Sequence, residues 1–233
     1  MNETKSVALC GVPGMKKRDI EKMEEYIKEE YPNIDFRYLG ESTLEKEELI
    51  DKGKEVEVLM SWDQEMDEEI YSKLNLKAYV AASAGFNAAN VEAASIYNVV
   101  VSNAKGYCKE EVAIHSIMFI LDFARRQHLM VPYVEDGNWD LEKAGSIRRF
   151  SNSTVGILGL GSIGSTVARF LSGFGVRIIA CDPNVSDEKM KEIGVEKVDF
   201  DILISEADFL TIHTPLAKET KGIINLDVLK CMK

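Results

Sequence analysis

Three glycines in this sequence have a spacing that suits the binding of a phosphate-bearing ligand. Gly159, Gly161 and Gly164 form a G-x-G-x-x-G loop directly after a short apolar run. Glycine at the first position permits a tight turn, at the second a close approach of a pyrophosphate to the main chain, and at the third close packing of the next helix. That helix is expected to start at Gly161, and its first turn, with Ser162 and Ile163, would present unpaired N–H groups to the ligand. The loop therefore predicts a pyrophosphate site.

An acidic residue follows at the distance that a dinucleotide site requires. Asp182 ends the apolar run Val176–Cys181 and lies 182 − 159 = 23 positions after the first glycine. A carboxylate there accepts hydrogen bonds from the adenosine ribose and repels the 2′-phosphate of NADP, so NAD is the predicted cofactor. The alternative is a plain glycine-rich turn followed by an ordinary aspartate. The coincidence of loop, context and acid favours the cofactor site.

The first hundred residues contain short apolar runs that alternate with amphipathic stretches, a pattern typical of a parallel sheet with helices on both faces. Strands are expected at Val7–Val12, Ile34–Leu39, Val56–Ser61, Ala78–Ala82 and Val99–Val101. Helices are expected at Asp19–Glu30, Leu44–Lys52, Asp67–Leu74 and Val91–Tyr97.

A long segment, about Glu110–Met130, has apolar residues at helical spacing and predicts one long interdomain or core helix. Residues Pro132–Phe150 predict an irregular connection, and a second α/β pattern follows. Its strands are expected at Thr154–Gly159, Val176–Cys181 and Asp208–Ile212, and its helices at Gly161–Phe174, Asp187–Ile193, Phe200–Glu206 and Leu226–Met232. The predicted fold is α/β, with a flavodoxin-like substrate domain over residues 1–104 and the first part of a Rossmann domain over residues 105–233.

The composition of the chain indicates which classes of partner are disfavoured. The 39 acidic and 28 basic residues give a net charge of −11, which disfavours nucleic acid and anionic lipid as partners. No apolar run is long enough to span a bilayer, and the N-terminus does not predict a signal peptide. The four cysteines are scattered, in a pattern typical of neither a metal site nor a disulfide framework. We expect a reduced, cytoplasmic protein with no metal.

Several stretches together resemble the D-isomer-specific 2-hydroxyacid dehydrogenases. The stretches that carry the resemblance are Ala84–Ala94, Val99–Asn103, Gly106–His115, Ala207–Leu216 and Glu219–Asn225. Ile147–Phe150 and the pair Asp182-Pro183 resemble the branch of phosphoglycerate dehydrogenase and the C-terminal-binding-protein corepressors. The resemblance covers most of the chain from about residue 77.

The resemblance implies site residues. Main-chain amides around Ala84, Gly85 and Phe86 would hold the carboxylate of the substrate, although a simple strand-to-helix turn is the alternative there. Val112 would pack near the cofactor, although a valine on a helix face is more often a core residue. The further cofactor-binding residues that the resemblance implies are Pro183, His213, Thr214, Pro215 and Thr220.

The implied activity is NAD-dependent interconversion of a small D-2-hydroxy acid and its 2-oxo acid. By the resemblance, the catalytic Arg, Glu and His would lie beyond Lys233, and we assign no acid/base role to His115, His128 or His213. We therefore expect a C-terminally truncated dehydrogenase without its catalytic residues. The alternative is a non-catalytic, dimerising NAD(H)-binding module. The resemblance also implies a homodimer formed through the Glu110–Met130 region.

Overall fold

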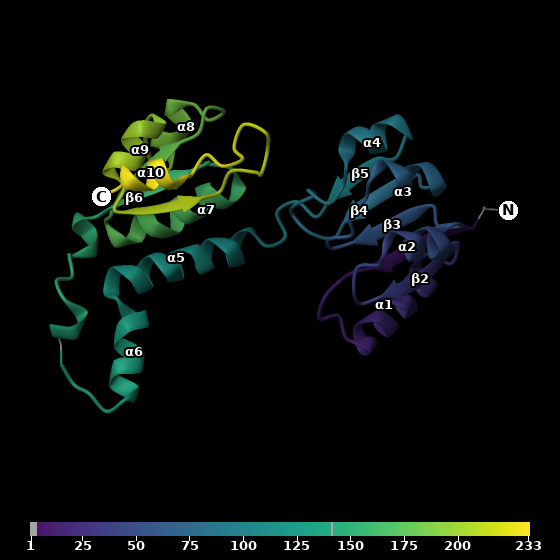
Figure 1. Cartoon of the computed structure of the whole chain (residues 1–233), viewed down its shortest axis with the longest axis horizontal. Helices are drawn as coiled ribbons and strands as arrows, with labels where there is room; N and C mark the ends of the chain where they lie inside the picture. Colours follow the sequence, from purple (N-terminus) through teal and green to yellow (C-terminus); the bar gives the residue numbers. More distant parts are fainter. Residues whose placement is uncertain (1–3, 141) are drawn as a thin grey trace. The chain divides into compact units, whose positions relative to one another are not determined.

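In the computed structural model, which describes residues 4–140 and 142–233, the chain forms two compact units, Met1–Tyr107 and Cys108–Lys233. The first unit contains one parallel sheet in the order β2-β1-β3-β4-β5 (Figure 1). This is the flavodoxin-like order that the sequence predicts. Its strands are β1 (Lys5–Cys10), β2 (Ile34–Gly40), β3 (Val58–Ser61), β4 (Ala78–Ala81) and β5 (Val100–Asn103). Its helices are α1 (Lys17–Glu30), α2 (Lys46–Gly53), α3 (Glu68–Lys73) and α4 (Val91–Ile96).

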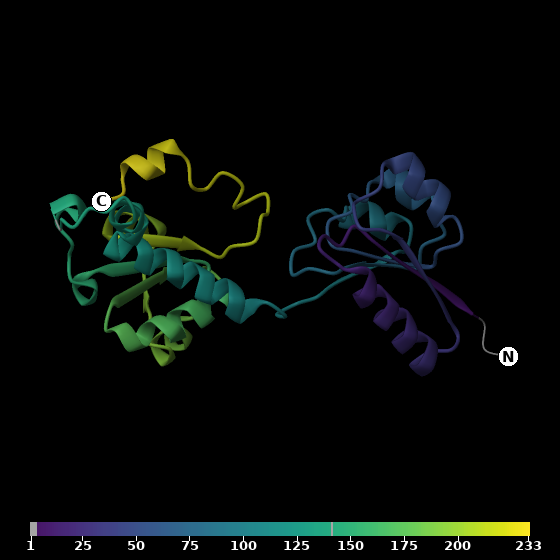
Figure 2. The ribbon, with the colours of Figure 1, turned by 90° about the horizontal axis from the view of Figure 1, so that it is seen from below.

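The helices of the first unit lie on both faces of the sheet. Figure 2 shows α1, in purple, on one face and the blue helices on the other. The face that α2, α3 and α4 cover contains the main core, in which Leu49, Tyr71 and Ala94 pack against Leu59 and Tyr79. All five side chains are almost fully buried, and burial of this kind stabilises by about 25 cal/mol per Å² of apolar surface. The core fixes the strand ends, from which the loops of the first unit extend.

The second unit contains a parallel sheet in the order β8-β7-β6-β9, which is the beginning of the Rossmann order. Both predicted fold types are therefore confirmed. Its strands are β6 (Thr154–Leu158), β7 (Arg177–Cys181), β8 (Glu196–Lys197) and β9 (Phe209–Ile212). Its helices are α5 (Lys109–Arg125), α6 (Gln127–Glu135), α7 (Ser162–Leu171), α8 (Asp187–Glu192), α9 (Phe200–Glu206) and α10 (Leu226–Lys230). Short 3₁₀ turns lie at Glu142–Ala144, Phe150–Asn152 and Ser172–Phe174.

The single long helix predicted over Glu110–Met130 is wrong. Two helices, α5 and α6, meet at Arg126, which has a left-handed backbone with φ +55°. Two contacts stabilise the break: Asp122 Oδ1 accepts from the main-chain N–H of His128 at 2.7 Å, and Arg126 Nη1 donates to the carbonyl of Ala144 at 2.7 Å. Helix α6 also continues past Pro132, where the sequence predicts an irregular connection.

The two faces of the second sheet are covered by different helices. Helices α5 and α7 pack together on one face, where Ile117 and Val167 are buried over Val155. Helix α9 covers the other face, where Leu203 packs on Ile179. This double cover makes β6 fully buried along its length, so its carboxyl end holds the following loop on a rigid support.

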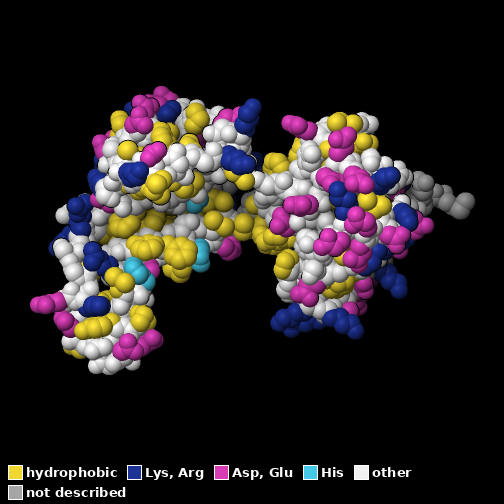
Figure 3. Space-filling view, viewed as in Figure 1, with side chains coloured by type: hydrophobic (Ala, Val, Ile, Leu, Met, Phe, Trp, Pro, Cys, Tyr) yellow, Lys and Arg dark blue, Asp and Glu magenta, His cyan; other side chains and the backbone are white. Residues whose placement is uncertain are grey.

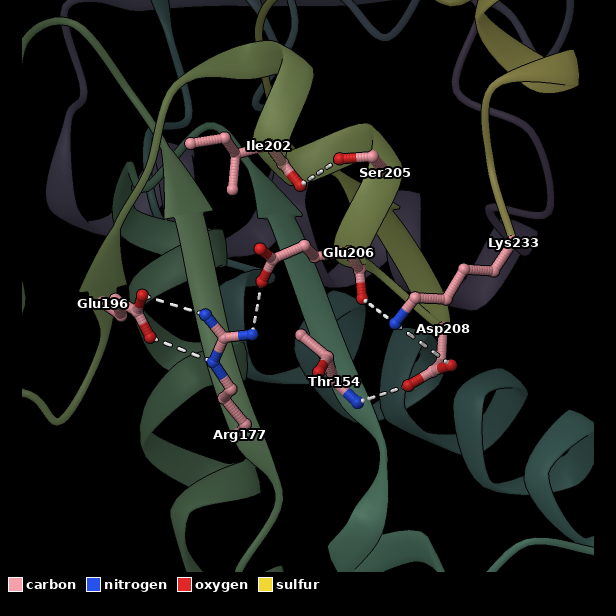
Figure 4. Close-up of polar contacts among 8 residues, drawn as sticks. All are labelled: Thr154, Arg177, Glu196, Ile202, Ser205, Glu206, Asp208 and Lys233. Atoms are coloured by element: carbon pink, nitrogen blue, oxygen red, sulfur yellow. Dashed lines mark hydrogen bonds and ion pairs between the residues drawn. The ribbon is translucent and has the colours of Figure 1, made fainter.

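Charged side chains at the amino ends of the second sheet's strands are paired with one another (Figure 4). Arg177 binds the carboxylate of Glu196 through Nε and Nη2, at 3.0 and 2.9 Å, and also donates to Glu206. Asp208 accepts the main-chain N–H of Thr154 at 2.8 Å and pairs with Arg148 at 2.9 Å. These contacts satisfy the polar groups at this edge. The opposite edge, at the carboxyl ends, carries the glycine-rich loop.

Three features of the described ranges, 4–140 and 142–233, bear on the partner classes. None of their helices combines the length and the apolar character needed to cross a membrane. None of their acidic, histidine and cysteine side chains gather in threes as a metal site would require. The four cysteines are free thiols.

Candidate functional site

The glycine-rich loop leaves β6 in a conformation that requires glycine. Gly159 has φ +90°, and a Cβ atom there would lie 2.8 Å from the main-chain nitrogen of Thr214 and 2.9 Å from the carbonyl carbon of His213. The loop therefore passes directly against the chain that leaves the neighbouring strand β9. Any side chain at position 159 would separate these two segments.

Gly164 and Gly161 serve different purposes in the same loop. A Cβ atom on Gly164 would lie 2.2 Å from the carbonyl oxygen of Gly159, so α7 can pack this closely on the loop only with glycine there. A Cβ atom on Gly161 would meet no protein atom within 4 Å. Glycine at this position thus leaves open space over the first turn of α7, and that space can admit a ligand.

The first turn of α7 presents free main-chain donors. Gly161 is the N-cap residue and makes no side-chain cap. Within the described part of the chain, the N–H groups of Gly161, Ser162, Ile163 and Gly164 have no hydrogen-bond acceptor. Unpaired N–H groups and the positive end of the helix dipole together favour an anion at this position.

Asp182 lies beside the glycine-rich loop, at the carboxyl end of β7. Its Oδ2 accepts the main-chain N–H of Leu160 at 2.7 Å, and its Oδ1 accepts that of Asn184 at 2.8 Å. Each carboxylate oxygen can accept at least one further hydrogen bond. The carboxylate therefore fixes the loop and keeps acceptor capacity for a hydroxyl group. Pro183 follows with an exposed side chain.

The segment after β9 completes this edge of the second sheet. The main-chain N–H of His213 donates to the carbonyl of Leu158 at 2.7 Å, and its Nε2 lies 2.9 Å from the hydroxyl of Thr211. Burial lowers the pKa of His213. The hydroxyl of Thr220 donates to the carbonyl of Pro215 and closes the loop between them.

A cavity of about 230 Å³ lies beside that closed loop, and Thr214, Pro215 and Thr220 line it together with apolar side chains. The structure thus brings Gly159, Asp182, His213 and Thr214 to one edge of the second sheet. Val112 lies in the first turn of α5, where its side chain is partly exposed, and its contact with a cofactor stays a prediction.

The first unit has its own set of free main-chain donors, in the loop after β4. The carbonyl of Ala84 accepts from Asn103 Nδ2 at 2.7 Å, and the carbonyl of Gly85 accepts from the hydroxyl of Ser83 at 2.7 Å. The N–H groups of Ala84, Gly85 and Phe86 have no acceptor among the residues that the structure describes. We call these three residues the amide cradle. Hydrogen bonds to the carbonyls of Ala84 and Gly85 fix the main chain of the cradle, and its N–H groups remain available to an anion.

Asn103 and Ser83 were not among the site residues predicted from the sequence. Asn103 was visible as a polar residue at the carboxyl end of a predicted strand, where side chains of neighbouring parallel strands meet. Its target, the carbonyl of Ala84, is set by the pairing of β4 with β5, which a sequence pattern does not specify. Asn103 therefore positions the amide cradle from the neighbouring strand.

Relatives of known name share most of this chain. A D-3-phosphoglycerate dehydrogenase of Archaeoglobus fulgidus is 34% identical over 192 residues, which is 82% of this chain and 36% of that protein. A glyoxylate reductase of Thermococcus litoralis is 31% identical over 193 residues, which is 79% of this chain and 58% of that protein. The chain thus spans about a third to three fifths of the length of these relatives.

Solved structures give the same picture. The structure of D-lactate dehydrogenase from Aquifex aeolicus, complexed with NAD and lactic acid, superposes on this chain with a TM-score of 0.85 and 26% sequence identity. The match covers 97% of this chain and 66% of the chain of that dehydrogenase. A family model for the NAD binding domain of D-isomer specific 2-hydroxyacid dehydrogenases matches residues 117–233, which are 117 of the 233 residues. These matches confirm the resemblance that the sequence motifs indicated, and the chain belongs to the D-isomer specific 2-hydroxyacid dehydrogenase family.

Proposed function

We propose that this chain binds NAD and a small 2-oxo acid as part of an oxidoreductase that interconverts a D-2-hydroxy acid and its 2-oxo acid. The observation that carries the proposal is the carboxyl edge of the second sheet. There, free N–H groups at the start of α7 lie in the same loop that Asp182 holds at 2.7 Å. An anion site beside a ribose acceptor is what a dinucleotide requires.

The cofactor residues divide by the part of NAD that they would bind. Gly161, Ser162 and Ile163 would donate main-chain N–H groups to the pyrophosphate, and Asp182 would accept from the adenosine ribose. The other residues proposed to lie along the cofactor are Val112, Gly159, Gly164, Pro183, His213, Thr214, Pro215 and Thr220. When bound, NAD supplies the hydride acceptor and donor of the reaction.

The amide cradle suits the carboxylate of the substrate. Its three N–H groups are free, and charge-assisted hydrogen bonds to them would fix the carboxylate without a cationic side chain. Relatives named D-lactate dehydrogenase, glyoxylate reductase and hydroxypyruvate reductase support a small 2-hydroxy or 2-oxo acid as the substrate class.

We assign no acid/base step to the histidines. His115 stacks edge-on against Phe119, and His128 pairs with Asp122 at 3.2 Å, both on the helices α5 and α6. His213 contacts Thr211 beside the cofactor edge, and burial keeps its pKa low, so it is poorly suited to hold a proton. Their contacts give each of them a positioning or packing role.

We also propose a homodimer formed through α5 and α6. Large apolar side chains are exposed on these helices, and Figure 3 shows hydrophobic side chains gathered over α5. They border a groove of about 630 Å³ that Met118, Phe119 and Val131 line. A second copy of the chain would bury these apolar side chains, and contiguous exposed apolar surface is a common mark of a protein interface. The exposed large apolar residues of the two helices are Val112, Ile114, Met118, Phe119, Phe123, Leu129, Val131 and Val134.

Amide NMR of the whole chain tests both sites in one experiment. NADH should shift the amide resonances of Gly161, Ser162 and Ile163, and pyruvate should shift those of the amide cradle, Ala84–Phe86. Pyruvamide, which lacks the negative charge, is the matched control and should leave the cradle unshifted. Absence of an NADH response at α7 would overturn the cofactor assignment. A cradle that responds equally to pyruvate and pyruvamide, or to neither, would overturn the substrate assignment.

A further inference from the structure

A small cavity of the first unit adjoins the amide cradle. It has a volume of about 170 Å³, and Gly85 and Phe86 of the cradle are among its lining residues. Trp62 and Asp63, which follow β3, and Tyr79 of β4 also line it. The remaining lining residues are Ala81, Ser83, Asn87 and Ala88. A molecule whose carboxylate lay in the cradle would therefore have the cavity beside it.

The walls of this cavity are mainly aromatic or small. Trp62 and Phe86 are 44% and 49% exposed, so both rings are accessible to a molecule in the cavity. Tyr79 is fully buried behind the cavity lining, and its hydroxyl donates to the carbonyl of Gln64 at 3.1 Å, so this hydroxyl is not available to a ligand. Ala81 and Ala88 add methyl groups only.

One charged side chain lines the cavity. Among the described lining residues, Asp63 is the single carboxylic acid, and no Lys, Arg or His lies with it. The carboxylate of Asp63 makes no ion pair or hydrogen bond within the described part of the chain. The nearby cation Lys46 is engaged by Asp67 at 2.5 Å and Glu69 at 3.2 Å, so it does not neutralise Asp63.

The charge of Asp63 acts on the cavity wall. Burial is the main cause that raises the pKa of Tyr79, and the charges of Cys10, Tyr71 and Asp63 raise it further. An anionic group placed in the cavity would lie close to the same uncompensated carboxylate. Asp63 is exposed, so we take an effective dielectric constant of about 40, between the values for a protein surface and for water. For a separation of about 6 Å, Coulomb's law then gives a penalty of about tenfold in affinity.

On the basis of the proposed function, we propose that this cavity binds the side group of the 2-oxo acid and that Asp63 restricts that group to uncharged ones. Trp62 and Phe86 favour apolar groups, and the volume admits about six heavy atoms at about 30 Å³ each. Substrates with a second carboxylate or a phosphate are excluded by repulsion from Asp63. Asp63 is thus a specificity-determining residue, and Trp62 and Phe86 form the surface on which the side group packs.

Trp62 supplies a local reporter. The chain has two tryptophans, and Trp139 belongs to the other unit and is 88% exposed. In a Trp139→Phe variant of the whole chain, emission comes from Trp62 alone. We would titrate it with 5-methyl-2-oxohexanoate and with 2-oxoglutarate. Their side groups have the same shape and five heavy atoms each, but only 2-oxoglutarate carries a second negative charge.

The expected result is a Kd for 2-oxoglutarate about tenfold above that for 5-methyl-2-oxohexanoate. Asp63→Asn should lower the Kd for 2-oxoglutarate about tenfold and leave the Kd for 5-methyl-2-oxohexanoate nearly unchanged. Glu65→Gln is the matched control, because Glu65 is an exposed acid two residues away that does not line this cavity, and it should leave the ratio unchanged.

Three results would overturn the inference: equal Kd values in the parent protein, a ratio that Asp63→Asn leaves unchanged, or a ratio that Glu65→Gln changes as much. Failure of the proposed function is distinguishable from these. If pyruvate shifts the cradle amides but Trp62 does not respond to 5-methyl-2-oxohexanoate, the cavity assignment is wrong and the carboxylate site stands. If neither the cradle amides respond to pyruvate nor Trp62 responds to 5-methyl-2-oxohexanoate, the assignment of the carboxylate site itself is wrong.

Discussion

Alanine at Gly164 and alanine at Gly161 should damage two different properties of the second unit. At Gly164, the added Cβ atom would lie 2.2 Å from the carbonyl oxygen of Gly159, so α7 and the loop must separate by about 1 Å. Such overpacking costs up to about 3 kcal/mol, and the better helix propensity of alanine returns about 1 kcal/mol. We therefore expect Gly164→Ala to lower the free energy of unfolding by about 2 kcal/mol.

At Gly161, the same methyl group meets no protein atom within 4 Å, and the residue has an ordinary φ of −68°. Alanine is a poorer N-cap than glycine, so the stability cost should stay below about 1 kcal/mol. The methyl group would instead occupy the space proposed for the pyrophosphate. Loss of two charge-assisted hydrogen bonds at about 1.5 kcal/mol each would raise the Kd for NADH more than 100-fold, to an order of magnitude.

Differential scanning calorimetry and NADH titration of each variant separate the two effects. Gly173→Ala is the control, because Gly173 also has open space and no positive φ, but lies after α7 and away from the loop. It should change neither property. The reasoning would be refuted if Gly161→Ala destabilised the unit as much as Gly164→Ala, or if it bound NADH with the affinity of the parent protein.

Four further changes have defined outcomes. Asp182→Ala removes the proposed ribose acceptor and its contact with the loop, so NADH should bind at least about tenfold more weakly. Titrations with NADH and NADPH should also show a smaller preference for NADH, and an unchanged ratio of the two Kd values would contradict the assignment. Asn103→Ala frees the carbonyl of Ala84 and should weaken pyruvate binding about tenfold without changing NADH binding, whereas equal losses of both would indicate general unfolding. Phe119→Glu places a charge in the exposed apolar surface of α5, so the mass measured by light scattering should fall from that of a dimer to that of a monomer. An unchanged mass would show that this surface does not form the interface. Burial lowers the pKa of His213, so the unfolded chain binds more protons at this residue than the folded chain does; the resulting contribution to stability is present above about pH 6.5 and is lost as the pH falls. His213→Gln should therefore make the free energy of unfolding fall less steeply with decreasing pH. An unchanged pH profile would show that His213 does not cause the loss of stability in acid.

Most elements of this fold were predictable from the sequence, because periodicity and turn residues are local properties. The strand Thr154–Leu158, the helix that follows Gly161 and the acidic residue at position 182 all follow from local patterns of apolar residues and glycines. The two-residue strand β8 was not predicted, since two residues are too few to show alternation. The break at Arg126 was not predicted either. It depends on contacts with Asp122 and Ala144, and the second of these lies 18 positions away.

The sequence by itself determined the glycine-rich loop and the carboxylate beside it, because three glycines and one aspartate at fixed spacing already specify the turn, the start of the helix and the acidic residue after the next strand. Tertiary structure decided the rest. Parallel pairing of β4 with β5 brings Asn103 behind the Ala84 carbonyl, and that contact leaves the cradle amides free. The packed sheet also places Asp63 beside Phe86 in one cavity. The residues of each pair lie about 20 positions apart in the sequence, and only the packed sheet brings them to one site.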